Sequence, residues 1–282
     1  MQFELGLMTG TFYNMDIFSA LQKAVDYKIK NVEILVSKNH FDVTDTRQAN
    51  EVREYIYDTN IDVYSVHAPH TPYWHNMDIT LSDESGRREA VNIVKMCIDF
   101  IASLPDLPNK RVVVHPGGEL RHFDKFSQKT QFYKSFSEIV MYARSKNINI
   151  ALENMLPHLF GGKLYDFTEI LMPYRVFDNV GVCFDTSHAN LTGDIAGYLT
   201  TILENFRIME FHLSDNLGSR DDHLMPFDGE IDWTNVFRIL QEHNGSRCFM
   251  FEINAPAIKN EDLYKKLNES VEKINTVFRS HN

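Results

Sequence analysis

Residues 180–194 read VGVCFDTSHANLTGD, and this stretch contains the unit on which the chain is built. It begins with a short apolar run, Val180–Phe184, which has the length and composition of a buried strand. Asp185 and His188 follow directly, and a helical pattern begins near residue 194. A strand that ends in chemically active residues and leads into a helix is typical of proteins with a parallel sheet.

The same unit recurs throughout the sequence. Apolar runs rich in Val, Ile and Phe predict eight strands, at Phe3–Leu7, Val32–Val36, Val63–Val66, Arg111–Val114, Ile148–Leu152, Val180–Phe184, Ile208–Leu213 and Cys248–Ile253. Amphipathic patterns predict eight helices, near residues 16–27, 44–59, 84–103, 126–146, 164–174, 194–205, 232–243 and 261–279. This alternation predicts an α/β fold, a single (β/α)8 TIM barrel domain over residues 1–282. A doubly wound open sheet is the main alternative, but no GxGxxG follows the first strand.

Composition and charge exclude several classes of protein. A net charge of −11 argues against broad binding to nucleic acid or acidic membranes, although a local basic rim stays compatible with it. The three cysteines form no CxxC pair, which argues against a disulfide framework or a thiolate metal site. The N-terminal sequence does not resemble a signal peptide, and no uncharged apolar run approaches the ~20 residues of a membrane span. We therefore expect a cytoplasmic protein.

Nine His, Asp and Glu residues lie at the ends of the predicted strands or in the loops that follow them. They are His67, His115, Glu153, Asp185, His188, His212, Asp221, His223 and Glu252. The longest irregular stretches, residues 67–83, 115–125 and 214–231, also follow strands, where a barrel builds its active site. Because the carboxyl ends of barrel strands meet at one mouth, we expect these side chains to form one cluster.

A metal site and ordinary structural roles compete as explanations of this pattern. A single histidine after a strand is more often a hydrogen-bonded structural residue than a ligand. If each is considered by itself, a structural role is therefore the better interpretation of His67, Asp221 and His223. Glu153 and Glu252 differ, because each ends a strongly apolar strand, where an unpaired charge is unfavourable. Carboxylates and imidazoles together are the ligands of zinc, manganese, cobalt or iron. The joint pattern predicts a divalent metal cofactor, zinc or manganese, with one to three ions.

Several of these segments carry a family resemblance over nearly the whole length, from GLMTGTF at residues 6–12 to FEIN at 251–254. The most specific are VHAP, VHPGG, LEN, FDTSHANLTGD and FHLSDNLGSRDDHLMPFDGEIDW. With them the chain resembles the xylose isomerase-like barrel superfamily, which includes type-IV apurinic endonucleases, tagatose and psicose 3-epimerases, hydroxypyruvate isomerases and inosose dehydratases.

The resemblance implies specific roles for the nine residues. The single-metal set of the epimerases maps onto Glu153, Asp185, His212 and Glu252. The endonucleases bind three zinc ions, and their sites also map onto this chain. The resemblance implies that His67, His115 and Glu153 would hold the first ion. The second would use the four epimerase positions, with Glu153 bridging, and the third would use His188, Asp221 and His223.

Two chemistries fit this one cluster. In an isomerase or epimerase, the resemblance makes Glu153 and Glu252 the catalytic residues that remove and return a proton beside a carbonyl. His188 and a nearby cation, for which Arg220 is the candidate, would bind substrate oxygens. An apurinic endonuclease would instead use clustered zinc ions to hydrolyse a phosphodiester.

Departures from the endonuclease pattern favour the isomerase or epimerase hypothesis over the endonuclease. The first strand has GLMTGTF where the endonucleases have a GAHVS-like run, and residues 153–161 read ENMLPHLFG in place of ENTAGQG. His70 stands where they have a DNA-contacting Tyr, and Phe41 stands where they have an Arg. Phe227 replaces a glycine that is usual in both groups, which affects the expected loop geometry.

The sequence therefore predicts a metal-dependent isomerase or epimerase, with a zinc-dependent apurinic endonuclease-like hydrolase as the alternative. The expected partner is a small-molecule sugar or sugar phosphate, with no membrane partner and nucleic acid disfavoured. Homo-oligomerisation is left open.

Overall fold

The computed structural model describes residues 6–70, 74–75, 77–243, 248–254 and 260–280. Its strands are β1 Gly6–Met8, β2 Asn31–Leu35, β3 Asp62–His67, β4 Arg111–Val114, β5 Asn149–Glu153, β6 Val180–Asp185, β7 Ile208–Leu213 and β8 Phe249–Phe251. Every neighbouring pair is parallel, and β1 pairs with β8, so the strands form a closed barrel in sequence order. The predicted (β/α)8 barrel is confirmed, and the open-sheet alternative is wrong.

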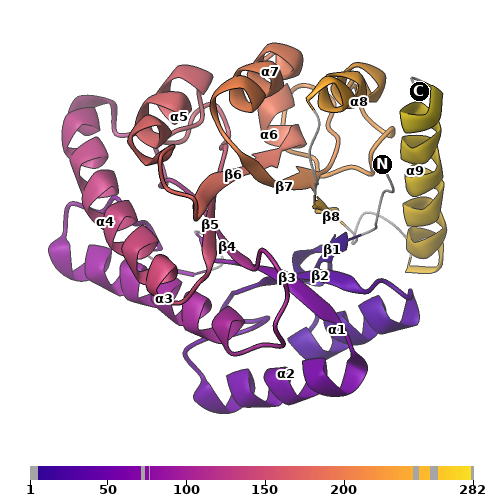
Figure 1. Ribbon diagram of the computed structural model, residues 1–282, viewed down its shortest axis with the longest axis horizontal. Coiled ribbons are helices and arrows are strands. Elements are labelled where there is room, and N and C mark those ends of the chain that lie inside the picture. Colours follow the sequence, from indigo (N-terminus) through magenta and orange to yellow (C-terminus); the bar gives the residue numbers. More distant parts are fainter. Residues whose placement is uncertain (1–5, 71–73, 76, 244–247, 255–259, 281–282) are drawn as a thin grey trace.

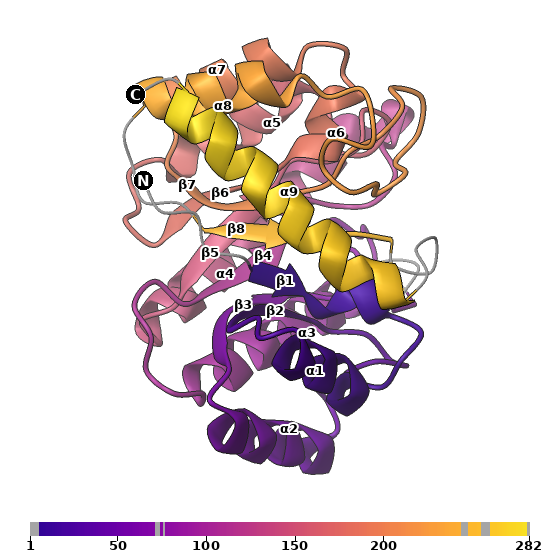
Figure 2. The same ribbon diagram turned by 90° about the vertical axis from the view of Figure 1, so that its right-hand side faces the viewer.

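The helices form a ring outside the strands (Figure 1). They are α1 Ile17–Asp26, α2 Thr46–Thr59, α3 Glu84–Ala102, α4 Lys125–Ser145, α5 Leu164–Leu171, α6 Thr186–Asn190, α7 Ile195–Asn205, α8 Trp233–Glu242 and α9 Asn260–Ser280, with short 3-10 segments η1 Thr9–Phe12, η2 His122–Asp124 and η3 Met172–Tyr174. Helix α9 lies on the side where β8 meets β1 (Figures 1 and 2). None of the helices in the described ranges is long and apolar enough to cross a membrane.

Aspartates begin most of the helices. The carboxylates of Asp16, Asp45, Asp83, Asp194 and Asp232 each accept hydrogen bonds from backbone N–H groups of the first turn. Such caps satisfy donors that have no partner inside the helix and fix where the helix starts. The starts predicted from the apolar period therefore agree with the observed ones to within two residues.

The remaining differences from the predicted elements are local. Residues 3–5 of the predicted first strand lie outside the described residues, and the last strand is shorter than expected. Helix α6 was not predicted, because its five residues are too few to show a helical period. It forms because Asp185 Oδ1 accepts a hydrogen bond from the backbone N–H of His188 at 2.6 Å.

The interior of the barrel contains a buried polar layer beneath the strand ends. Glu33 and Glu210 are 0% exposed, and Arg111 is 3% exposed. Ser65 donates a hydrogen bond to Glu210 at 2.7 Å, and the Arg111 Nε atom lies 3.9 Å from the Glu210 carboxylate. Burial and the nearby charge of Glu33 raise the pKa of Glu210 to about 7, while Arg111 opposes this shift. Arg111 is therefore the cation that compensates two buried acids.

We expect Arg111→Met to lower the free energy of unfolding by ~3 kcal/mol, because removing one partner leaves a buried charge uncompensated. Without Arg111 the raised pKa of Glu210 rises further. An acid whose pKa is higher in the folded than in the unfolded protein destabilises the folded state as the pH rises. The loss of stability caused by Arg111→Met should therefore be larger near pH 9 than near pH 6. Chemical denaturation at both pH values measures this.

The matched control is the double variant Arg111→Met/Glu210→Gln, which removes both charges and should recover much of the lost stability. A single variant as stable as the original protein at both pH values would contradict a compensating role for Arg111.

Candidate metal centre

All nine residues singled out in the sequence lie at the carboxyl-terminal end of the barrel. The strand ends carry His67 (β3), Glu153 (β5), Asp185 (β6) and His212 (β7), and the segments beyond the strands carry His115, His188, Asp221, His223 and Glu252. A cavity of about 650 Å³ opens here, lined among others by His115, Glu153, His188, Asp221, His223 and Glu252. The expectation that these side chains gather at one mouth is therefore met.

Four of them form a central group, consisting of Glu153, Asp185, His212 and Glu252. Each offers one ligand atom, and these atoms all lie within 4.8 Å of one another. His212 Nδ1 lies 3.0 Å from Glu252 Oε2, yet neither atom has a hydrogen-bond partner among the described residues, and the same is true of Asp185 Oδ2. Buried polar atoms are nearly always hydrogen-bonded. Unbonded atoms of three different side chains, directed at one small volume, fit a metal ion.

Asn154 holds one side of the central group in place. Its side chain accepts a hydrogen bond from the Asp185 backbone N–H at 2.8 Å and donates one to the Asp185 carbonyl at 3.0 Å. The Asn154 carbonyl in turn accepts a hydrogen bond from His188 Nδ1 at 2.8 Å. This interaction directs the other ring nitrogen of His188, Nε2, away from β5 and toward Asp221, 3.3 Å away.

The two carboxylate oxygens of Glu153 face different neighbours. Oε2 lies 3.0 Å from His67 Nε2 and 3.1 Å from His115 Nε2. Oε1 lies 3.5 Å from both His212 Nδ1 and His188 Nδ1. The side chain therefore connects the central group to the pair His67 and His115, as the bridging role implied by the family resemblance requires.

A further group lies on the far side of the cavity. His188, Asp221 and His223 each offer a ligand atom within 4.8 Å of the others. Asp221 Oδ2 lies 2.9 Å from His223 Nε2. The His223 Nδ1 atom donates to the Glu252 carbonyl at 3.1 Å, which orients the ring.

Mutual attraction between acids and histidines shifts the pKa values of the cluster. Burial alone would lower the pKa of His67, but its hydrogen bond to Glu153 and the charges of Glu153 and Glu33 raise it to about 9. Burial opposes ionisation of Glu252, yet His223 and His212 hold its pKa at about 2. For His223, burial is outweighed by the charge of Glu252 and the hydrogen bond to Asp221, which raise its pKa to about 10.

Asp185 behaves differently from the other acids. Burial raises its pKa to about 7, and His188 only partly offsets this, because Glu252, Glu153 and Asp221 add like charge nearby. Protons on His67, His223 and Asp185 thus help to balance the charge of the acids. A divalent cation would take over that balancing charge.

Asp215 organises the loop that carries Asp221 and His223. Its carboxylate accepts hydrogen bonds from the backbone N–H groups of Phe227 and Ile231, each at 3.1 Å, and from Trp233 Nε1 at 2.8 Å. The Asp215 side chain is fully buried. A charged acceptor with several donors fixes a loop that has little regular structure of its own.

Phe227 occupies the loop position where the family resemblance leads us to expect a glycine. Its backbone adopts φ +77°, in the left-handed region that favours glycine. The ring packs against Trp233, with the ring centroids 5.7 Å apart. Phe227 therefore adopts a glycine-like backbone at this position, and its ring contact with Trp233 is one interaction that favours the conformation.

Two residues of the site were missed in the sequence. Glu33 Oε1 lies 3.0 Å from His212 Nε2, on the side of the ring opposite the central group. His70 offers a ring nitrogen within 4.8 Å of ligand atoms of both His67 and His115. An acid inside the apolar strand NVEIL was a usable signal for Glu33, whereas His70 was noted only as a departure from the endonuclease pattern.

The structure does not place Arg220 with the other predicted site residues. Its side chain is 81% exposed and is paired with Asp222. The cavity lining is formed by other residues, including the neighbouring Asp221 and His223. Arg220 is not among the residues that line the cavity, and its role in binding a substrate stays a prediction.

Three relatives have similar sequences. The uncharacterised protein y4fM of Sinorhizobium fredii is 29% identical over 59% of this chain, and the match spans 53% of y4fM, about half its length. The uncharacterised protein MJ1311 of Methanocaldococcus jannaschii is 25% identical over 95% of this chain and 90% of its own length. A probable endonuclease 4 of Clostridium botulinum is 23% identical, covering 62% of this chain and 64% of the endonuclease.

Solved structures show the same fold. A D-tagatose 3-epimerase-like protein superposes with a TM-score of 0.80 at 24% identity, covering 97% of this chain and 99% of that protein. An IOLI protein with a bound zinc atom superposes with a TM-score of 0.74 at 20% identity, covering 98% of this chain and 96% of that protein. The family model described as "Xylose isomerase-like TIM barrel" matches residues 21–274, which include all nine residues of the cluster. With this match over most of its length, the chain belongs to the xylose isomerase-like TIM barrel family.

Proposed function

We propose that this protein is a metal-dependent isomerase or epimerase of a sugar or sugar phosphate, which moves a proton at a carbon next to a carbonyl. The observation that carries the proposal is the central group, in which Glu153, Asp185, His212 and Glu252 present ligand atoms within 4.8 Å of one another. Two of these residues are glutamates that also line the cavity, where a substrate would be bound.

The donor set of the central group suits zinc or manganese. Three carboxylates and one imidazole are ligands that both ions accept. Glu33 supports this assignment, because its position beside His212 Nε2 directs the other ring nitrogen, Nδ1, at the central group. The group of His188, Asp221 and His223 and the pair of His67 and His115 allow up to two further ions. A bound divalent ion would polarise substrate oxygens and stabilise the negative charge that develops on them.

The two glutamates have the positions and charges needed for proton transfer. Glu153 ends β5 and Glu252 follows β8, so the side chains enter the cavity from separate sides of the barrel. His115 and His212 hold the pKa of Glu153 well below its usual range against the effect of burial, so this side chain is ionised, which is the form that a base needs. One glutamate would take a proton from a carbon of the substrate, and the other would give one back on the opposite face, with the proton passing from the first glutamate to the second through solvent.

The cavity suits a small polar substrate. Its volume of about 650 Å³ is in the range of sites for small molecules. His188 lies between the central group and Asp221 and is placed to orient a substrate hydroxyl. The likeness to a D-tagatose 3-epimerase-like protein supports a ketose or its phosphate as the substrate class.

Phosphodiester hydrolysis is the second candidate, and one observation favours it. His188, Asp221 and His223 form a ligand group outside the central four, which a single-metal reaction does not need. The probable endonuclease 4 among the relatives points the same way. The net charge of −11 and the replacement of the DNA-contacting Tyr and Arg by His70 and Phe41 oppose it.

We expect zinc or manganese binding to the chelator-treated protein to release protons. His67 and His223, with pKa values of about 9 and about 10, are protonated at neutral pH, and a coordinated imidazole must be neutral. Fewer protons must leave as the pH rises, so apparent affinity should increase from about pH 6 to about pH 9. Calorimetric titration in buffers of different ionisation enthalpy measures the proton count, and an affinity independent of pH would contradict this account.

Glu153→Gln and Glu252→Gln should each lower turnover of a ketose or ketose phosphate by ~10²–10⁴-fold. Glutamine keeps an oxygen ligand but cannot act as a base, so part of the bound metal should remain, as metal analysis would show. The original protein should also incorporate solvent deuterium at the reacting carbon. Glu230→Gln is the matched control, because Glu230 is an exposed glutamate on the loop that carries Asp221.

His223→Ala separates the two candidate functions. It leaves the four residues of the central group intact, so it should affect an isomerase much less than either glutamate change. Three results together would establish the hydrolase instead. His223→Ala would lower activity as much as the glutamate changes do, turnover would incorporate no solvent deuterium, and the protein would incise abasic duplex DNA at physiological salt.

A further inference from the structure

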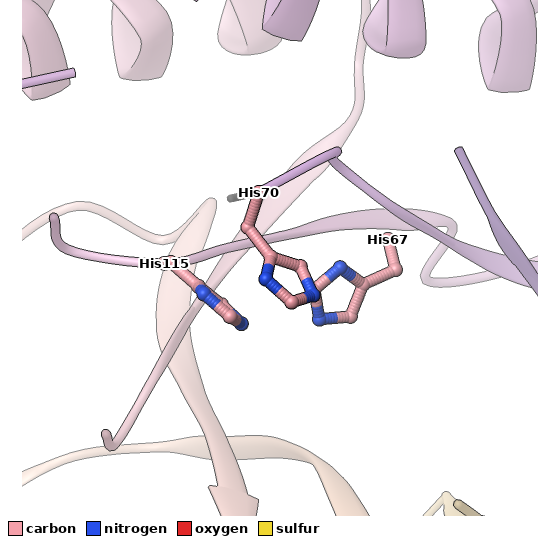
Figure 3. A group of neighbouring side chains, drawn as sticks. All are labelled: His67, His70 and His115. Atoms are coloured by element: carbon pink, nitrogen blue, oxygen red, sulfur yellow. The ribbon is translucent and has the colours of Figure 1, made fainter. Parts of the chain in front are cut away.

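Three histidines meet beside the central group, and one of them has no role in the proposed reaction. His67, His70 and His115 each offer a ring nitrogen, and these nitrogens all lie within 4.8 Å of one another. Figure 3 shows the His70 ring lying beside both His67 and His115. The ring centroids are 5.0 Å apart for His67 and His115, 4.3 Å for His70 and His115, and 5.6 Å for His67 and His70.

Separate segments supply the three rings. His67 ends β3, His70 lies in the loop that follows β3, and His115 follows β4, the neighbouring strand. His67 is 1% exposed, and its Nδ1 atom donates a hydrogen bond to the Ala68 carbonyl at 2.8 Å, which leaves Nε2 as the ligand atom. His70 and His115 line the cavity. Two of the rings are thus held by strand ends, while the third reaches them from a loop, where small adjustments are easy.

The geometry is close to that of a metal site. Zinc is bound by imidazole nitrogens at about 2.0–2.1 Å, so nitrogens that share one tetrahedral ion lie roughly 3.4 Å apart. Nitrogens within 4.8 Å of one another reach that spacing by side-chain rotation. Glu153 Oε2, 3.0 Å from His67 Nε2 and 3.1 Å from His115 Nε2, supplies negative charge beside the three rings.

We propose that His67, His70 and His115 form a three-histidine site for zinc or a similar borderline transition metal. The site is distinct in chemistry from the central group, which has three carboxylates and one imidazole. Imidazole donors suit zinc, nickel and copper, whereas carboxylates also accept manganese. The chain therefore carries two neighbouring sites with different metal preferences, and His70 is the residue that makes the first of them rich in nitrogen.

The test compares zinc and manganese binding by equilibrium dialysis of the chelator-treated full-length chain. The original protein should bind at least one more zinc ion than manganese ions. His70→Ala should lose one zinc ion per chain, or bind it at least ~10-fold more weakly, and should keep its manganese stoichiometry. His70→Asn, closer in size to histidine, should behave in the same way. His75→Ala is the control, because His75 lines the same cavity from the same loop but lies outside the three-histidine group.

Cobalt provides a readout that does not depend on activity. Cobalt bound at a nitrogen-rich site absorbs visible light, and His70→Ala should remove one component of that spectrum while His75→Ala preserves it. The proposal would be overturned if both His70 variants kept the zinc stoichiometry, the zinc affinity and the cobalt spectrum of the original protein. That result would leave the proposed reaction at the central group intact, because manganese binding and the glutamate variants test it separately.

Discussion

Mutual repulsion among buried acids is the constraint on which the rest of this barrel depends. Six carboxylates share the interior and the mouth of the barrel, those of Glu33, Glu153, Asp185, Glu210, Asp221 and Glu252, and the first four are at most 1% exposed. Two like charges 4 Å apart repel by about 4 kcal/mol at an effective dielectric constant of 20. The fold therefore requires positive charge between them, from Arg111 below, from histidines above, and from protons or metal ions.

His212 joins the two layers of this charged interior. Its Nε2 atom faces Glu33 at 3.0 Å in the lower layer, and its Nδ1 atom faces Glu252 at 3.0 Å in the upper one. A side chain held from both ends has little freedom to rotate. The lower layer thus fixes the direction of a proposed ligand, as partners behind a metal ligand commonly do.

The candidate ligands are carried partly by strands and partly by loops, which differ in rigidity. The central group rests on the ends of β5, β6 and β7 and on the residue after β8, so hydrogen-bonded strands set its geometry. The outer groups depend on loops, through His70 on one side and through Asp221 and His223 on the other. Loops accept substitutions more readily than strands. Members of one barrel family can therefore share the central group and differ in the further ions and the substrates that they bind.

The sequence alone determined the barrel and the place of nine site residues within it. Both follow from local rules, since an apolar run predicts a strand wherever its partners lie, and the ends of parallel strands must meet at one mouth. The tertiary structure decided what depends on side-chain direction. His70 turns toward His67 and His115, Arg220 pairs with Asp222 outside the cavity, and Phe227 takes a glycine-like backbone against Trp233. Contacts between segments distant in sequence set these directions, and no local pattern records them.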